Sequence, residues 1–350
     1  MIKYGNILIK NIYYMLSYAF QNLNFICGES IKTENFENIQ DLLATILCGG
    51  INTQLKRGIY KEYEEKEEVL SCIKGKIIFT KSISQATMID KKLVCNFDEF
   101  TENTYINQVL KSTCELLISK GDIKLQNKKL LKKVLLYFSH VDSIDIKRIN
   151  WSRITYHRNN ITYKTLINIC YLIIEGLIST TESGELKFNR YLDDQYMHHL
   201  YEKFILEFYK KHFPQLNPGS KCIDWNIIDS NEIEFLPKMQ SDIMLEHSGK
   251  TLIIDAKFYK HSMQERFEKK SFISGNLYQI YTYVKNKDVT HSGNVSGLLL
   301  YAKTDEEQIP DNEYIFDNNK IGIKTLDLNT DWINIKNKLI DIAQTIIKQE

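Results

Sequence analysis

Two aspartates and a lysine lie on neighbouring segments whose pattern predicts strand, tight turn and strand. Apolar residues flank Asp242, Ser248-Gly249 supplies the turn, and Leu252-Ile253-Ile254 leads into Asp255. Residues two apart in a strand project from one face, so Asp255 and Lys257 point together. A hairpin or neighbouring-strand arrangement would bring Asp242 alongside them. Two carboxylates and one ammonium at a sheet edge could hold Mg²⁺ and a water molecule and cut a phosphodiester.

Each of these three residues could have a distinct role in phosphodiester hydrolysis. Mg²⁺ prefers carboxylate, carbonyl and water oxygens, which Asp242, Asp255 and the backbone carbonyl of Ala256 could supply. The metal would lower the pKa of a bound water and neutralise charge on the phosphate. Lys257 would orient the attacking water and offset charge in the transition state. The alternative is an ordinary surface ion pair near a hairpin.

Two helices could add polar groups to the site. A long helix is predicted over Asp193 to Phe213, and its Glu202 could complete the metal site; Glu207 is a weaker candidate on the same helix. Gln279, on a helix predicted over Phe272 to Val284, could hydrogen-bond DNA or the attacking water. A solvent-facing position is an equal alternative for Glu202 and for Gln279.

The pair His198-His199 receives no role, because successive helical side chains point about 100° apart and do not chelate. Tyr259 would lie on the same face as Lys257 and could line the site, although packing is the more common use of such a tyrosine.

A basic stretch next to the proposed site could contact DNA phosphates. It contains Lys260, Arg266, Lys269 and Lys270, and a solvated loop is the alternative. The whole chain has 45 basic and 44 acidic residues and a net charge of +1, without the basic excess typical of nucleic-acid binders. We therefore expect DNA affinity to depend on this local patch or on a partner.

Three absences narrow the function. The chain has no GxxxxGK[ST] phosphate-binding loop, so any nucleotide hydrolysis that drives the system would belong to another chain. The apolar run from Leu166 to Ile178 is too short to span a bilayer, and the start lacks a signal-peptide pattern. Seven scattered cysteines without metal-ligand spacing indicate reduced thiols in the cytoplasm.

The length of 350 residues favours two domains, and we place the boundary near 185, which gives 1–184 and 185–350. In the first domain the patterns predict helices over Asn11–Phe25, Ile39–Leu55, Asn103–Ser119, Asn127–Phe138 and Tyr163–Thr180, with strands over Lys76–Phe79 and Leu93–Phe97. The charged run from Arg57 to Leu70 is a solvated hairpin or helix face, or else an arm that contacts a partner. Ser139–Asn160 is predicted to be linker or loop.

The second domain alternates strands and helices. Strands are predicted over Lys221–Ile228, Ile233–Leu236, Lys238–Leu245, Thr251–Phe258, Gly297–Tyr301 and Lys320–Leu326, and a closing helix over Asp331–Ile347. Together with the long helix before them, these elements predict a three-layer α/β core.

The chain resembles the McrC family, the nuclease subunits of modification-dependent restriction systems, over nearly its whole length. The most specific similarity lies in Leu236-Pro237-Lys238-Met239-Gln240-Ser241-Asp242-Ile243, in Ile253-Ile254-Asp255-Ala256-Lys257-Phe258-Tyr259-Lys260 and in Asn276-Leu277-Tyr278-Gln279. Further similarity lies near the N-terminus in Lys10-Asn11-Ile12-Tyr13-Tyr14-Met15-Leu16-Ser17-Tyr18-Ala19, and in Phe97-Asp98-Glu99-Phe100-Thr101-Glu102-Asn103-Thr104.

The resemblance implies an α+β N-terminal domain and a C-terminal PD-(D/E)xK restriction-endonuclease-like α/β/α core. Asp242, Asp255 and Lys257 would be the catalytic set, with Ser241 standing where the motif name has proline. Family members dock on McrB, a hexameric AAA+ GTPase, inserting into its pore and stimulating GTP hydrolysis. McrB recognises methylated cytosine in double-stranded DNA, so the partner would supply specificity, and self-association could bridge two complexes.

The resemblance also makes the stretch from Arg57 to Glu68 the candidate pore-facing element, with Lys56, Arg57, Tyr60 and Lys61 as partner-binding residues. Two alternatives stay open. The chain could be a non-cleaving bridge and activator of the motor, or a nuclease paired with a motor of different nucleotide or modification specificity.

Overall fold

The chain divides into two compact units, described here from a computed structural model. Residues 1–42 and 189–350 form one, which we call the split unit, and residues 43–188 form the other, the inserted unit. The structure describes residues 3–4, 7–20, 36, 38–176, 178–180, 186–188, 194–227, 235–258, 263–266, 269–303 and 311–347. Helices and strands are mixed in both units, which confirms the predicted α/β class.

The predicted contiguous domain of residues 1–184 needs correction at its N-terminal end. Helix α1 (Ile9–Ala19) packs within the split unit, against α9 (Asp194–His212) and the segment before α11 (Trp332–Ile347). Asn11 Nδ2 donates to the carbonyls of Leu328 and Thr330, at 2.8 Å each, and the Tyr14 ring stacks on Trp332 at 4.5 Å. These partners lie more than 300 residues away, so local patterns could not reveal them.

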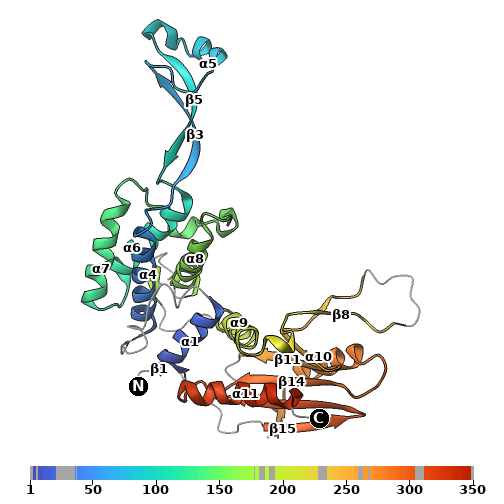
Figure 1. The fold of residues 1–350 in the computed structure, drawn as a ribbon. Coiled ribbons are helices and arrows are strands. Elements are labelled where there is room, and N and C mark those ends of the chain that lie inside the picture. The colour runs from blue at the N-terminus through green and yellow to red at the C-terminus, as the bar shows by residue number, and fades with distance from the viewer. Residues whose placement is uncertain are drawn as a thin grey trace. The chain divides into compact units, whose positions relative to one another are not determined.

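A five-stranded sheet forms the centre of the split unit (Figure 1). Its order is β10 (Ile243–His247), β11 (Lys250–Lys257), β14 (Val295–Ala302), β16 (Asn319–Leu326) and β15 (Asp311–Phe316). β11, β14 and β16 are parallel, whereas β10 and β15 run antiparallel to their neighbours. The two central strands β11 and β14 are almost continuously buried, as expected where parallel strands are covered on both faces.

Helices cover the two faces of this sheet. On one face, α10 (Ser274–Lys287) packs through Ile280 and Val284 into a core cluster that includes Ile253 and Leu299. On the opposite face, α11 approaches Leu252 and Leu298 with Ile342. Gly297 of β14 lets α10 come close, because a Cβ there would lie 2.7 Å from Cγ1 of Ile280. The α10 face carries the odd-numbered residues of β11, including Asp255 and Lys257.

Several predicted elements differ in extent. The helix predicted over Asn11–Phe25 spans Ile9–Ala19, and the residues after Phe20 lie outside the described range until Phe36. The helix predicted over Tyr163–Thr180 is α8 (Lys164–Tyr171), a π-helical turn (Leu172–Gly176) and β6 (Ile178–Thr180). The strand predicted over Lys221–Ile228 is reduced to β8 (Cys222–Ile223). Of the strand predicted over Ile233–Leu236, the first two residues lie outside the described residues, and Phe235 and Leu236 are not in a strand.

Several strands were missed by the patterns. β15, an exposed edge strand with little apolar alternation, was not predicted. The stretch predicted as a basic loop contains an antiparallel hairpin of β12 (Met263–Arg266) and β13 (Lys269–Phe272). The remaining short strands of the split unit and its flanks are β1 (Lys3–Tyr4), β2 (Ile7–Leu8), β7 (Leu186–Phe188) and β9 (Met239–Gln240).

The inserted unit is a group of helices from which a long β-ribbon extends (Figure 1). The helices are α6 (Tyr105–Lys120), α7 (Leu125–Leu135), α8 and most of α4 (Ile39–Leu55). The ribbon, which we call the arm, pairs β3 (Glu62–Leu70) with β5 (Leu93–Thr101) along nine residues. Its far end carries β4 (Lys76–Ile77), α5 (Phe79–Ser84) and a 3₁₀ turn (Thr87–Asp90). The charged run therefore forms one strand of a β-ribbon, as the hairpin alternative predicts, and its contact with a partner stays a prediction. No helix among the described residues is long and apolar enough to cross a bilayer.

Candidate active site

Asp242, Asp255 and Lys257 converge at one end of the sheet. Asp242 immediately precedes β10, and the antiparallel register that pairs Ile243 with Ile254 sets it opposite Asp255. Its Oδ2 accepts a hydrogen bond of 2.8 Å from the backbone amide of Ala256. The Lys257 ammonium lies 2.9 Å from Oδ2 of Asp255. The arrangement proposed from the spacing, with the three side chains on one face, is thus present.

This cluster is unusually buried for charged groups. Asp255 is 1% exposed and Lys257 is 7% exposed. No donor within the described residues reaches either oxygen of Asp255 with hydrogen-bond geometry, although the Lys257 ammonium is at ion-pair distance. A buried carboxylate with incomplete partners is costly to fold, and native structures keep such groups mainly where they have a function.

Both aspartates bind a proton more tightly than an ordinary carboxylate. Burial is the largest cause that raises the pKa of Asp242 to about 7, and the charges of Asp255 and Glu202 add to it. Burial also raises the pKa of Asp255, where the Lys257 ammonium opposes it. At neutral pH the pair therefore favours sharing a proton or binding a cation over carrying two full negative charges.

Glu202 approaches this pair from α9 but is held by two histidines. His198 Nε2 lies 2.9 Å from Glu202 Oε1, and His199 Nδ1 lies 3.4 Å from Oε2. Burial raises the pKa of Glu202, but the hydrogen bonds and charges of His198 and His199 outweigh it and leave the pKa below its usual value. No role for these histidines was predicted from the sequence, although the i, i+4 spacing of His198 and Glu202 is a signal for such a contact.

An open hollow of about 340 Å³ lies beside Asp242. Its lining joins α9 to the strands and consists of His199, Glu202, Lys203, Leu206, Ser220, Gln240, Ser241 and Asp242. Ser241, which stands in the proline position of the motif name, donates its backbone N–H to the Lys221 carbonyl at 3.0 Å. A proline has no N–H and could not make this bond, so the serine allows the segment before Asp242 to pair with the segment at Lys221.

The donor set suits a hard divalent cation. Two adjacent carboxylates, one of them lacking good hydrogen-bond donors, are the oxygen ligands that Mg²⁺ prefers, and water completes such a site. Among the residues that the structure describes, no three His, Cys, Asp or Glu side chains are grouped as a complete ligand set. Glu202 contacts the two histidines and does not form a three-residue ligand group with Asp242 and Asp255. The ligand roles of Glu202 and of the Ala256 carbonyl therefore stay predictions.

Neutralising Asp242 should stabilise the metal-free protein. The folded-state pKa is raised from 3.8 to about 7, so the stability that the protonated carboxyl contributes is lost as pH rises between these values. Asp242→Asn cannot ionise and keeps an oxygen for the Ala256 amide. In EDTA at pH 8 we expect the variant to gain on the order of 2 kcal/mol in unfolding free energy, and less than half of that at pH 5.

The measurement is urea unfolding at both pH values, with and without Mg²⁺. Mg²⁺ should stabilise the wild-type chain and leave Asp242→Asn almost unchanged, because the variant lacks one of the paired charges. A gain that is equal at the two pH values would contradict a raised pKa at Asp242.

Gln279 and the residues around it lie on α10. Its Nε2 donates to the Tyr283 hydroxyl at 2.9 Å, within the same helix, and its part in catalysis stays a prediction. Asn276, one turn earlier, reaches the sheet instead: its Nδ2 donates to the Tyr301 hydroxyl at 2.9 Å. Tyr301 is the register neighbour of Lys257 in the parallel pair of β11 and β14. Asn276 and Tyr301 are thus site neighbours that only the strand register reveals.

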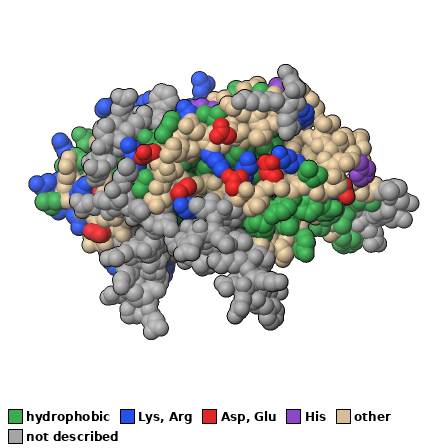
Figure 2. All heavy atoms as spheres, turned by 90° about the horizontal axis from the view of Figure 1, so that it is seen from below, with side chains coloured by type: hydrophobic (Ala, Val, Ile, Leu, Met, Phe, Trp, Pro, Cys, Tyr) green, Lys and Arg blue, Asp and Glu red, His purple; other side chains and the backbone are tan. Residues whose placement is uncertain are grey.

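The predicted DNA-contact residues are only partly described. Tyr259 and Lys260 lie outside the described residues, whereas Arg266, Lys269 and Lys270 belong to the β12–β13 hairpin, whose side chains are not described. On the face shown in Figure 2, the coloured basic and acidic side chains are interspersed and do not form a basic field. This fits the net charge of +1.

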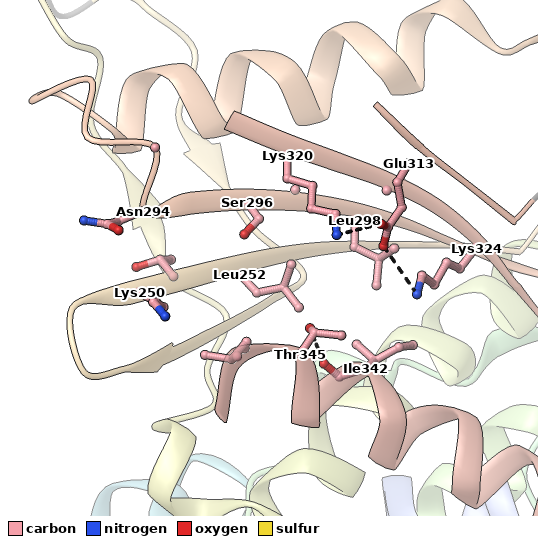
Figure 3. Close-up of a pocket in the computed structure, with 15 residues that line it drawn as sticks. Lys250, Leu252, Asn294, Ser296, Leu298, Glu313, Lys320, Lys324, Ile342 and Thr345 are labelled. Atoms are coloured by element: carbon pink, nitrogen blue, oxygen red, sulfur yellow. Dashed lines mark hydrogen bonds and ion pairs between the residues drawn. The ribbon is translucent and has the colours of Figure 1, made fainter. Parts of the chain in front are cut away.

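A second, smaller cavity of about 90 Å³ lies on the opposite face of the sheet (Figure 3). Even-numbered residues of β11, β14 and β16 line it, together with α11, and its Lys320 and Lys324 both approach Glu313. Since Asp255 and Lys257 face the α10 side, this cavity is separate from the candidate active site.

The predicted partner-binding residues lie at the base of the arm. Lys56 and Arg57 are exposed in the turn that follows α4, and Lys61 pairs with Glu102 at 2.9 Å. Tyr60 is 9% exposed, so little of its surface is open to a partner, and its part in partner binding stays a prediction. Its hydroxyl bonds to Glu62 and to His157 Nε2, and its N–H donates to the Tyr163 hydroxyl.

Asn107 fixes both strands of the arm to α6. This buried side chain donates from Nδ2 to the Tyr60 carbonyl at 2.7 Å and to the Glu102 carbonyl at 2.8 Å. Strand β3 is solvated, with cross-strand ion pairs such as Lys66 with Glu99, whereas β5 buries Val94 and Cys95 toward the far end of the arm. Its far end exposes more than half of each of five apolar side chains: Ile73, Phe79, Ile83, Met88 and Ile89. Five such exposed side chains within 17 residues at the end of the arm make this end a candidate interaction surface.

Comparisons with known proteins agree over most of the chain. A family model described as McrBC 5-methylcytosine restriction system component matches residues 6–302. The chain is 28% identical over 343 residues to the Type IV methyl-directed restriction enzyme EcoKMcrBC of Escherichia coli (strain K12), covering 97% of this chain and 98% of that protein.

A solved structure is similar in fold. It is the refined half-complex from a tetradecameric assembly of Thermococcus gammatolerans McrB AAA+ hexamers with bound McrC, with a TM-score of 0.54 at 16% identity. The similarity covers 95% of this chain and 76% of that chain.

Proposed function

The chain belongs to the family of McrBC 5-methylcytosine restriction system components, and on this premise we propose that it is the Mg²⁺-dependent DNA endonuclease subunit of such a system. The split unit would carry a PD-(D/E)xK nuclease core, and the subunit would cut DNA when assembled with an McrB-like AAA+ GTPase hexamer. The proposed setting is the cytoplasm, in keeping with the six described cysteines, all of which are unpaired.

The observation that carries the nuclease proposal is the buried convergence of Asp242, Asp255 and Lys257. A surface ion pair would not place a 1%-exposed carboxylate without good hydrogen-bond donors beside a second carboxylate. A non-cleaving bridge would have no need of this destabilising arrangement, so the geometry favours a working site over the alternative of an activator alone.

The chain's own residues have distinct parts in the proposed reaction. Asp242 and Asp255 would supply the anionic oxygens, and the Ala256 amide orients Asp242 through its 2.8 Å hydrogen bond. Mg²⁺, when bound, would neutralise phosphate charge and acidify water. The Lys257 ammonium, held 2.9 Å from Asp255, would donate a hydrogen bond to the attacking water or to the phosphate and stabilise the charge that develops there.

The arm is the proposed contact with the motor. The relative of known structure is described as McrC bound to McrB AAA+ hexamers, and its tetradecameric assembly supports a role that bridges two complexes. In this chain the arm offers a long, charged ribbon with an apolar end, anchored at its base by Tyr60 and Asn107. We propose that it enters the ring and stimulates GTP hydrolysis, while the motor selects methylated double-stranded DNA.

A reconstituted cleavage assay tests the proposal. The chain is mixed with the AAA+ protein encoded beside it, GTP, Mg²⁺ and a plasmid that does or does not carry 5-methylcytosine. We expect cleavage only when all components and the modification are present. Cleavage that needs ATP or another modified base would support the alternative motor specificity, and cleavage in EDTA would contradict a metal-dependent nuclease.

A further inference from the structure

His198 connects two parts of the candidate active site that are distant in sequence. Its Nδ1 accepts a hydrogen bond of 3.2 Å from the backbone N–H of Phe258, the residue directly after Lys257. Its Nε2 lies 2.9 Å from Oε1 of Glu202. Because Nδ1 is the acceptor, the ring proton lies on Nε2 and points to Glu202. The imidazole is therefore oriented from both sides.

Each of these bonds fixes a group that matters for the site. β11 ends at Lys257, so the Phe258 amide has left the sheet ladder and takes His198 as its acceptor. The Phe258 ring also packs near Tyr201 of α9, at 6.1 Å between centroids. The C-terminal end of the strand that bears Asp255 and Lys257 is thus attached to α9.

Glu202 is the other group that His198 holds. Its charge acts on both Asp242 and Asp255, and it lines the same hollow as Asp242. A free glutamate on a helix would sample several rotamers, whereas this one is 25% exposed and bonded at both oxygens. Groups that orient the surroundings of a metal typically change its affinity about 10-fold or more when removed.

We propose that His198 is a positioning residue for the nuclease site: it holds Glu202 beside the aspartate pair and fixes the backbone that follows Lys257. This inference rests on the proposed function. His199 is not equivalent, because its side chain is 67% exposed and its contact with Glu202 is longer, at 3.4 Å.

Three substitutions of His198 test its hydrogen bonds to the Phe258 N–H and to Glu202 one at a time. His198→Asn can accept from the Phe258 N–H but is too short to reach Glu202. His198→Gln can donate to Glu202 but gives up the Phe258 contact, and His198→Ala loses both. Lys210→Ala is the matched control, because Lys210 is an exposed residue of α9 that pairs with Glu207, and neither residue lines the hollow beside Asp242.

Two readouts are taken on the full chain. The first is hydrogen exchange of the Phe258 amide, measured without DNA or metal. The second is the Mg²⁺ concentration for half-maximal cleavage, measured together with kcat in the assembly with the GTPase. We expect faster exchange in the Gln and Ala variants only. We expect a half-maximal Mg²⁺ concentration raised about 10-fold in the Asn and Ala variants, with a smaller change in the Gln variant.

An unchanged half-maximal Mg²⁺ concentration in both the Asn and Ala variants would overturn the inference. An equal rise of this concentration in the Asn and Gln variants would also overturn it, because it would indicate only a general packing role. Failure of the proposed function looks different. If the proposed function is wrong, Asp255→Asn still cleaves DNA. If only the positioning role is wrong, Asp255→Asn is inactive and the His198 variants behave like the wild-type chain.

Discussion

Asp255→Asn and Lys257→Ala should each lower DNA cleavage by the assembled complex by at least about 100-fold, while stimulation of the partner's GTP hydrolysis is retained. The reason is that both side chains belong to the buried cluster at the end of β11, and the arm belongs to the separately folded inserted unit. The measurement is plasmid cleavage and GTP turnover in one reaction.

Matched controls exist on the same sheet. Lys320 of β16 and Glu313 of β15 form an ion pair of 2.6 Å beside the cavity on the opposite face of the sheet, so Lys320→Ala and Glu313→Gln remove the same kinds of charge away from the cluster. These variants should cleave like the wild-type chain. Full activity of Asp255→Asn would refute the assigned site, and loss of both activities in a folded variant would refute the division of roles between the units.

Stability must be separated from catalysis in this test. Removing Lys257 leaves two buried carboxylates without their ammonium partner, which costs about 3–5 kcal/mol in unfolding free energy. The double variant Asp255→Asn with Lys257→Met removes both charges and should recover much of this stability. It should remain inactive, which would show that the loss of cleavage comes from chemistry and not from unfolding.

Shortening the arm should abolish stimulation of the partner without damaging the nuclease unit. Glu65 and Asp98 lie directly opposite each other in the β3–β5 ladder, so residues 66–97 can be replaced by a two-residue Asn-Gly turn. We expect GTP hydrolysis by the partner to fall about tenfold or more, to its rate without this chain. Mg²⁺-dependent stabilisation of the split unit should be unchanged.

A second variant tests whether the strand ladder of the arm or its apolar end stimulates GTP hydrolysis by the partner. Replacing Ile73, Phe79, Ile83 and Ile89 by serine keeps the strand ladder and removes exposed apolar surface. If the end makes the contact, this variant behaves like the shortened arm. If both variants stimulate GTP hydrolysis normally, the arm is not the stimulating element and the exposed Lys56 and Arg57 become the remaining candidates.

The sequence determined the parts of the site that depend on local periodicity. The period of two along Ile253 to Lys257 placed Asp255 and Lys257 on one face, and the turn at Ser248-Gly249 predicted the pairing of β10 with β11. The charged run after Arg57 left a hairpin, a helix face and an arm open, because solvated strands and helices both tolerate such residues. Family motifs then identified the chemistry that spacing alone only allowed.

Only the tertiary structure decided which distant residues meet. It joined α1 to α9 and Trp332, placed His198 between Glu202 and the Phe258 amide, and brought Asn276 to Tyr301 beside Lys257. It also buried Tyr60 at the base of the arm. The physical reason is that hydrophobic periodicity specifies which face of an element is covered but not by which partner, and that choice is made by side-chain packing and hydrogen bonding across the whole fold.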